Sequence, residues 1–84
     1  MDREINLARM EEGQTGIISN ITGGGRLRLK LESMGIRPGS KVLKVSNIFH
    51  RGPIVLNVGG MEVAIGYRMA RRIFVNPNPL ERSL

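Results

Sequence analysis

Three consecutive glycines at residues 23–25 lead directly into a short basic and apolar segment, which ends at Gly35 and then at Pro38-Gly39. Glycine relieves the steric limits that a Cβ atom places on the backbone, and a proline soon after a helix prevents the helix from continuing. The segment Arg26–Met34 is therefore expected to be one short element between two tight changes of direction. So many turn-forming residues in a chain of 84 residues favour one small domain made of short helices and strands.

The pattern within this segment fits two structures. Leucines alternate with basic residues, which is typical of a strand, but Leu27, Leu31 and Met34 also occupy one helix face at i, i+4 and i+7. We favour the helix, because the segment is rich in good helix formers and has no β-branched residue. Gly35 then stands where a left-handed helix stop belongs. This interpretation leaves Leu29 exposed.

The rest of the chain is typical of short strands bounded by turn residues. Gly59-Gly60 is a strong signal for a two-residue hairpin, and Lys44 interrupts its strand in a way that a β-bulge would explain. Helical turns are expected at residues 7–10 and 66–72. Strands are expected at residues 15–21, 41–49, 54–58, 61–65 and 73–75.

Side-chain alternation predicts which residues of two strands share a face. In the first strand, Ile17 and Ile21 are expected on one face. In the strand after the hairpin, Met61, Val63 and Ile65 are expected to point inward.

Five short strands separated by glycine turns indicate an all-β fold that closes into a small barrel, because an open sheet of this size would leave long unpaired edges. We expect one domain over residues 1–76 and a flexible C-terminal tail over residues 77–84.

The positive charge is concentrated in one block. Residues 26–51 hold seven Lys and Arg and one Glu, a net charge of +6 that equals the charge of the whole chain. Such a block suggests an anionic partner, although a solvated basic surface explains it equally well. The chain has no cysteine and no apolar run near the ~20 residues that a membrane span needs. We therefore expect a cytoplasmic protein with no membrane insertion.

The sequence offers no catalytic constellation. His50 is the one histidine, and the carboxylates are scattered, so a partnered base or nucleophile is not expected. A transition-metal site needs three or four converging ligands, which no spacing here supplies within one chain. We predict no enzyme, no cofactor and no metal site within one chain, and interpret His50 as a solvent-facing turn residue. A site between two chains stays open, as does a homo-oligomer.

The candidate partner-binding surface is the basic helix, where an exposed leucine would lie among positive charges. A solvated helix face is the alternative. The loops after the long strand and before the last strand lie at barrel edges, where small barrels often bind partners. The residues predicted for this surface are Arg26, Arg28, Leu29, Lys30, Arg37, Arg51, Pro53 and Tyr67.

Two spaced motifs resemble those of a known family. The first is Gly24-Gly25-x5-Leu31-x2-Met34-Gly35-Ile36-x-Pro38-Gly39, and the second is Val63-Ala64-Ile65-Gly66-x2-Met69-Ala70. Together they make residues 5–75 similar to the FeoA family of ferrous iron uptake proteins. The resemblance implies a five-stranded SH3-like barrel with one short helix inserted after the first strand. It also implies a cytosolic accessory role in transition-metal transport, docking on a FeoB-type transporter with a cytosolic GTPase domain.

Two other functions remain open from the residues. A nucleic-acid-binding small β-barrel is favoured by the charge, but disfavoured because Phe49, Tyr67 and Phe74 are not interleaved with the basic block. The second open function is a stand-alone metal-responsive regulatory module, because related domains occur at the C-terminus of iron-dependent repressors of the DtxR type.

Overall fold

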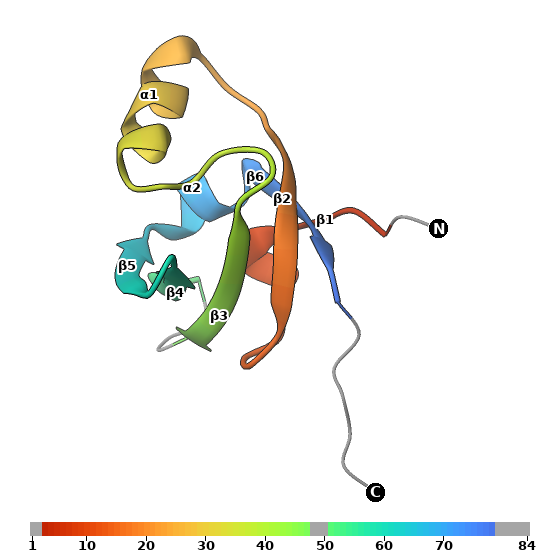
Figure 1. The fold of residues 1–84 in the computed structure, drawn as a ribbon. Helices are drawn as coiled ribbons and strands as arrows, with labels where there is room; N and C mark the ends of the chain where they lie inside the picture. The colour runs from red at the N-terminus through yellow and green to blue at the C-terminus, as the bar shows by residue number, and fades with distance from the viewer. Residues whose placement is uncertain (1–2, 48–50, 79–84) are drawn as a thin grey trace, which may run out of the picture.

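The computed structural model describes residues 3–47 and 51–78, which form one curved antiparallel sheet with two helices (Figure 1). Within these residues there are six strands, one more than expected. The extra strand is β1, which has only two residues and pairs with β6. The elements are β1 Ile5–Asn6, the 3-10 turn η1 Leu7–Arg9, β2 Thr15–Ile21, α1 Gly25–Ser33, β3 Lys41–Asn47, β4 Ile54–Val58, β5 Met61–Ile65, α2 Tyr67–Ala70 and β6 Ile73–Pro77.

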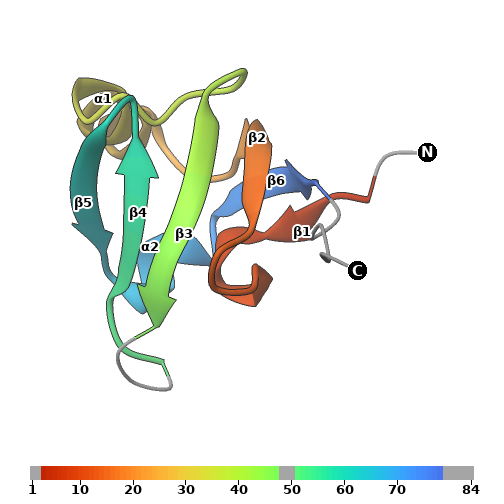
Figure 2. The same ribbon diagram turned by 60° about the horizontal axis from the view of Figure 1, so that its bottom comes forward.

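The strand order is β1-β6-β2-β3-β4-β5. Strand β2 joins two halves of the sheet, because it pairs with β6 over most of its length and with β3 only at its first three residues. Figure 2 shows the halves, β3-β4-β5 and β1-β6-β2, with α2 between them at one end and α1 at the other. This curvature encloses one small core, as expected for a mostly β fold with one inserted helix.

The segment between the glycines and Gly35 is a helix, so the helical interpretation is confirmed. Gly35 has a φ of +83°, its N–H donates to the Glu32 carbonyl at 2.9 Å, and the Ile36 N–H donates to the Leu31 carbonyl at 2.9 Å. This is the Schellman arrangement, which a left-handed residue allows and glycine adopts without strain. Leu31 and Ile36 are both fully buried, so the helix end is fixed by packing as well as by hydrogen bonds.

The predicted hairpin and bulge are also present. Val58 pairs with Met61 across Gly59-Gly60, and both glycines have positive φ, as a type I′ turn requires. The register of β3 against β4 shifts just after Lys44. The sequence signals for both features are local, which is why they could be predicted.

The predicted face of β2 is wrong, because the strand contains a bulge that its sequence does not reveal. Ile18 pairs with Val75 but Asn20 pairs with Phe74, so one extra residue is inserted between them. The insertion reverses the alternation. Ile18 and Ile21 are consequently buried together, and Ile17 is 39% exposed on the outside.

The last strand extends beyond the predicted end of regular structure. Strand β6 runs to Pro77, and the Asn78 N–H donates to the Thr15 carbonyl at 2.8 Å. The Asn78 side chain also donates to the Thr15 hydroxyl at 3.0 Å. Residues 79–84, which belong to the predicted tail, and residues 48–50, which belong to the predicted end of β3, lie outside the described residues.

The core is aliphatic. Its buried hydrophobic members come from every strand except β1, from η1 and from both helices. They are Leu7, Met10, Ile18, Ile21, Leu31, Ile36, Val42, Ile54, Leu56, Ile65, Ala70, Ile73 and Val75.

Candidate functional site

An open groove of about 880 Å³ lies between the C-terminal end of α1, the start of β3 and the β4–β5 hairpin. The Schellman turn and the two-residue hairpin position its two walls. It is lined by Thr15, Ser33, Met34, Gly35, Ser40, Lys41, Val42, Leu43, Asn57, Val58, Gly59, Met61 and Val63.

The groove is apolar because the inner face of the sheet is left uncovered at this end. Met61 and Val63 lie on the same face of β5 as buried Ile65, and Met34 and Val58 lie across from them. The expectation that Met61 points into the core is wrong, since its side chain is 69% exposed. Met61 is the first residue of β5, directly after the Gly59-Gly60 turn, and its side chain meets solvent.

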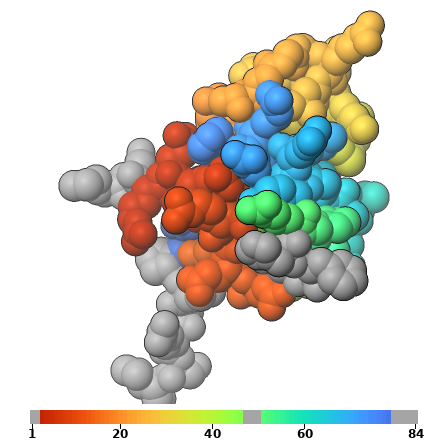
Figure 3. Space-filling view, turned by 180° about the vertical axis from the view of Figure 1, so that it is seen from behind, coloured from red at the N-terminus to blue at the C-terminus, as the bar shows by residue number. Residues whose placement is uncertain are grey.

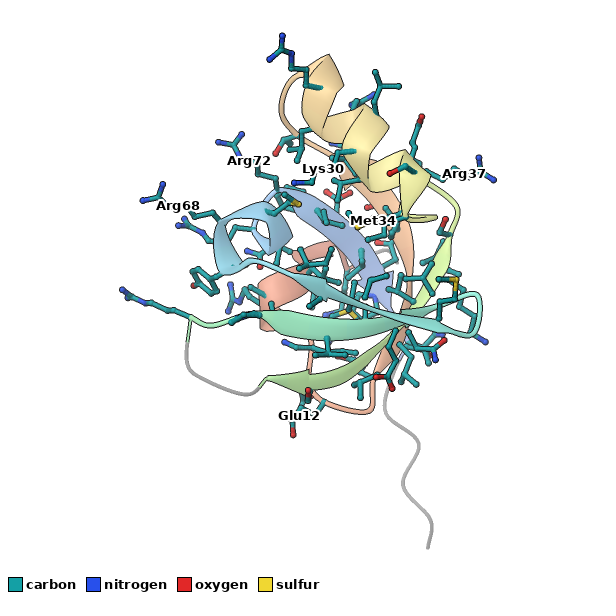
Figure 4. All side chains as sticks on the ribbon, turned by 90° about the vertical axis from the view of Figure 1, so that its left-hand side faces the viewer. Glu12, Lys30, Met34, Arg37, Arg68 and Arg72 are labelled. Carbon is teal, nitrogen blue, oxygen red and sulfur yellow. The ribbon has the colours of Figure 1, made fainter. Side chains whose placement is uncertain are left out.

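One charged side chain, Lys41, belongs to the described lining, and no carboxylate does. Arg37 lies on the same side of the molecule as Met34 (Figure 4). An apolar hollow with a positive rim can bury apolar side chains of a partner while pairing with an acidic group beside them. This combination is suited to binding a partner.

A second surface is strongly basic. Arg68, Arg71 and Arg72, at and just after α2, line a hollow of about 390 Å³. The Thr22 N–H donates to the Arg72 carbonyl at 2.8 Å, so the end of α2 lies beside the segment that leads into α1. Figure 3 shows these two parts of the surface, orange to yellow and blue, adjoining each other. We call the exposed cations that border this junction the basic face, namely Arg26, Lys30, Arg68, Arg71 and Arg72.

The structure separates the predicted partner-binding residues. On α1, Arg26, Leu29 and Lys30 are exposed, and Leu29 is 69% exposed as expected. The Arg28 guanidinium instead donates to the Ile21 carbonyl at 2.9 Å, back onto the end of β2. Arg37 lies past the other end of the helix, on the groove side (Figure 4).

The remaining predicted residues lie on other elements. Arg51 and Pro53 are exposed in the connection between β3 and β4. Tyr67 is half-buried at the start of α2, with the Arg71 guanidinium 5.9 Å from its ring centre. These residues belong to the two connections that the sequence assigned to the barrel edges, and they lie apart from α1.

Sequence reasoning missed the arginines after α2. The spacing of Arg68, Arg71 and Arg72 places them on one helical turn and was readable from the sequence. Their position beside the start of α1 depends on the hydrogen bond between Thr22 and Arg72, which joins residues 50 positions apart. That contact carries no local sequence signal.

Among the residues whose burial the structure describes, Lys44 is the one charged residue that is buried. Its side chain is 0% exposed, and its Nζ donates to the Ala8 carbonyl at 3.1 Å and the Met10 carbonyl at 2.5 Å. Desolvation lowers the pKa of Lys44 below its usual value, and the Glu12 carboxylate opposes this shift. One of the seven basic residues of the charged block is thus buried in the fold and does not contribute to the charged surface.

The described residues contain neither a cluster of metal-ligating side chains nor a helix that could span a membrane. Over residues 3–47 and 51–78, no three His, Asp or Glu side chains lie together as metal ligands would. His50 lies outside these ranges, so its predicted role stays a prediction. Neither α1 nor α2 is long and apolar enough to cross a bilayer.

The profile of the FeoA domain family matches residues 5–77. A putative Fe(2+) transport protein A from Methanocaldococcus jannaschii is 36% identical over 69 residues, which cover 82% of each chain. The crystal structure of an iron uptake regulatory protein, FeoA, superposes with a TM-score of 0.82 at 38% identity, covering 90% of this chain and 99% of that one. A FeoA-like protein from Clostridium acetobutylicum has a TM-score of 0.84 over 100% of this chain and 98% of that one, and at 21% identity it shows the fold alone.

Proposed function

Because this chain belongs to the FeoA family, we propose that it is an accessory protein of ferrous iron uptake that docks on the cytosolic region of a FeoB-type transporter. Its part in this function is binding, without catalysis of its own. The groove between α1 and the β4–β5 hairpin is the surface that we assign to docking. The observation that carries the proposal is the apolar lining of this groove, with Met61 69% exposed at its edge.

The energetics support docking at this position. Covering a Met-sized or Leu-sized side chain removes enough apolar area from water to contribute about 1.5–3 kcal/mol. A few such side chains at the centre of an interface commonly supply most of the binding energy. Met34, Val58, Met61 and Val63 provide such a centre. Because Val58, Met61 and Val63 belong to strands and Met34 caps α1, the conformational entropy lost when a partner covers them is mainly that of side-chain rotamers.

The charge around the groove indicates which segment would fit. Lys41 lines the groove and Arg37 lies on the same side, while the lining contains no carboxylate. We therefore expect an apolar segment of the transporter with acidic residues beside it. The charge complementarity would increase the association rate and make it depend on salt.

Two equally exposed apolar residues allow a direct test. Met61, in the groove, and Leu29, on the outer side of α1, are each 69% exposed. Binding of the purified chain to the isolated cytosolic region of its transporter would be measured for Met61→Asp and Leu29→Asp by calorimetry, without lipid.

We expect Met61→Asp to weaken binding by at least about tenfold, because it places a charge in an apolar contact. Leu29→Asp should change the affinity by less than about threefold, as is usual for a residue outside an interface. The opposite result would assign docking to the helix surface. Undetectable binding of the folded wild-type chain would contradict the proposed function.

A further inference from the structure

We propose that the basic face binds the anionic lipid headgroups of a membrane surface and holds the domain with α1 and the end of α2 against the bilayer. This contact is separate from docking in the groove. It would hold the domain at the membrane surface, next to a membrane-embedded partner. Its chemistry is electrostatic attraction to headgroup phosphates, assisted by one exposed leucine.

The geometry of α1 supports this arrangement. Leu27 and Leu31 face the body of the domain, and Leu31 is fully buried. Arg26 and Lys30 are one helical turn apart on one flank, and Leu29 lies on the outward side. Figure 4 shows Lys30 on the same side of the domain as Arg68 and Arg72, with α1 projecting beyond the sheet. The face therefore carries five cations, with an apolar side chain at its edge.

The cations of the basic face are available to a partner. In the described part of the chain, no hydrogen bond or ion pair involves the side chains of Arg26, Lys30, Arg68 or Arg72. The Arg71 guanidinium lies 5.9 Å from the centre of the Tyr67 ring. Arginine forms bidentate hydrogen bonds with phosphate and is less strongly hydrated than lysine, so phosphate groups are suitable ligands.

Two acidic residues lie away from the basic face. Glu12 is at the bottom of the view in Figure 4, away from Arg68 and Arg72, and Glu11 precedes it in the chain. An anionic plane would attract the basic face and repel these two acidic residues. Each Lys or Arg near an anionic bilayer contributes about fivefold to the binding constant, so five together give measurable attachment at low salt.

Lipid fits this face better than nucleic acid does. Single-stranded nucleic acids are bound on exposed aromatic side chains, whereas Tyr67 and Phe74 are half-buried and Tyr67 lies beneath Arg71. Leucine together with Lys and Arg is instead a common composition of helices that lie in a membrane interface. Leu29 supplies that leucine.

Membrane contact would leave the docking groove open. The groove begins at Met34 and Gly35, at the opposite end of α1 from the glycines that precede it. Arg37 and Lys41 lie on the groove side, away from Arg68 and Arg72. The two surfaces can therefore be tested separately, and failure of one does not imply failure of the other.

The test is sedimentation of the full chain with phosphatidylcholine vesicles that contain or lack phosphatidylglycerol, at low and physiological salt. Two double variants remove the same charge, R68Q/R72Q from the basic face and R37Q/K41Q from the groove side. All four substituted side chains are exposed, and thermal melts would verify that both variants fold.

We expect binding to the phosphatidylglycerol vesicles only, weakened by salt. R68Q/R72Q should reduce the partition constant by about 25-fold, and R37Q/K41Q by less than about threefold. Equal loss in both variants would overturn the proposal, because it would show a dependence on net charge alone. No vesicle binding at low salt, or complete displacement by an equimolar acidic peptide or single-stranded DNA, would also overturn it.

Discussion

The Nζ atom of Lys44 lies 2.5 Å from the carbonyl oxygen of Met10, so a fully buried ammonium group joins β3 to the turn that follows η1. The same nitrogen donates to the Ala8 carbonyl. Through these contacts, Lys44 fixes the N-terminal segment against the barrel. They explain why a strand that otherwise packs apolar residues inward contains a lysine.

Replacing Lys44 should destabilise the fold. Lys44→Met keeps the length of the side chain but leaves the Met10 and Ala8 carbonyls without their donor, which should lower the free energy of unfolding by about 1–3 kcal/mol at neutral pH. Lys41→Met, on the exposed side of the same strand, is the control and should stay within about 0.5 kcal/mol. Urea denaturation measures both, and a Lys44→Met protein as stable as wild type would show that these hydrogen bonds contribute nothing net.

The cost of burying the ammonium also predicts a pH dependence. Because burial lowers the pKa of Lys44 in the folded protein, the unfolded chain binds more protons between that lowered pKa and 10.5. The free energy of unfolding of wild type should therefore rise with pH in this window, relative to Lys44→Met. Below the window the difference should be constant. Denaturation of both proteins at a series of alkaline pH values measures this difference in the free energy of unfolding. If wild type instead lost stability relative to Lys44→Met as the pH rises, the lowered pKa of Lys44 would be contradicted.

Glycine at position 35 should be required by its backbone conformation. Gly35→Ala places a Cβ atom on a residue with φ of +83°, and we expect a loss of about 1–2 kcal/mol. Gly25→Ala, at the first residue of α1 with no atom within 4 Å of the new Cβ, should be neutral or stabilise by up to about 1 kcal/mol. Thermal denaturation would distinguish them, and equal effects at both positions would show that the left-handed conformation is not strained.

Two leucines of α1 test the direction of the helix. Leu31 is fully buried and Leu29 is 69% exposed, although a strand would place both on one face. We expect Leu31→Ala to cost about 2–5 kcal/mol and Leu29→Ala less than about 0.5 kcal/mol. Comparable losses for both would mean that the segment is extended in solution.

Local signals in the sequence were enough for much of the fold. The helix, its stop at Gly35 and the Gly59-Gly60 hairpin each depend on residues within a few positions of one another, and the structure confirms all three. The bulge between Ile18 and Asn20 was missed, because it is specified by the pairing of β2 with β6 more than 50 residues away.

The candidate site was harder to predict from the sequence, because it also depends on contacts between residues that are far apart in the chain. The groove brings together Met34, at the end of α1, and Met61, at the start of β5, and no residue near Met61 indicates this contact. The basic face depends on the contact between Thr22 and Arg72, two residues that are 50 positions apart in the sequence. Charge and residue type could identify Arg26, Leu29 and Lys30 as exposed, but could not show which residues from other elements lie beside them.

The most direct test of the docking proposal is to titrate the isotope-labelled chain with the isolated cytosolic region of its transporter and follow backbone amide chemical shifts by NMR. We expect the largest changes at the groove, at Met34, Lys41 and Met61, with small changes at Arg68 and Arg72. Changes confined to the basic face, or no changes at saturating concentration, would contradict the assignment of docking to the groove.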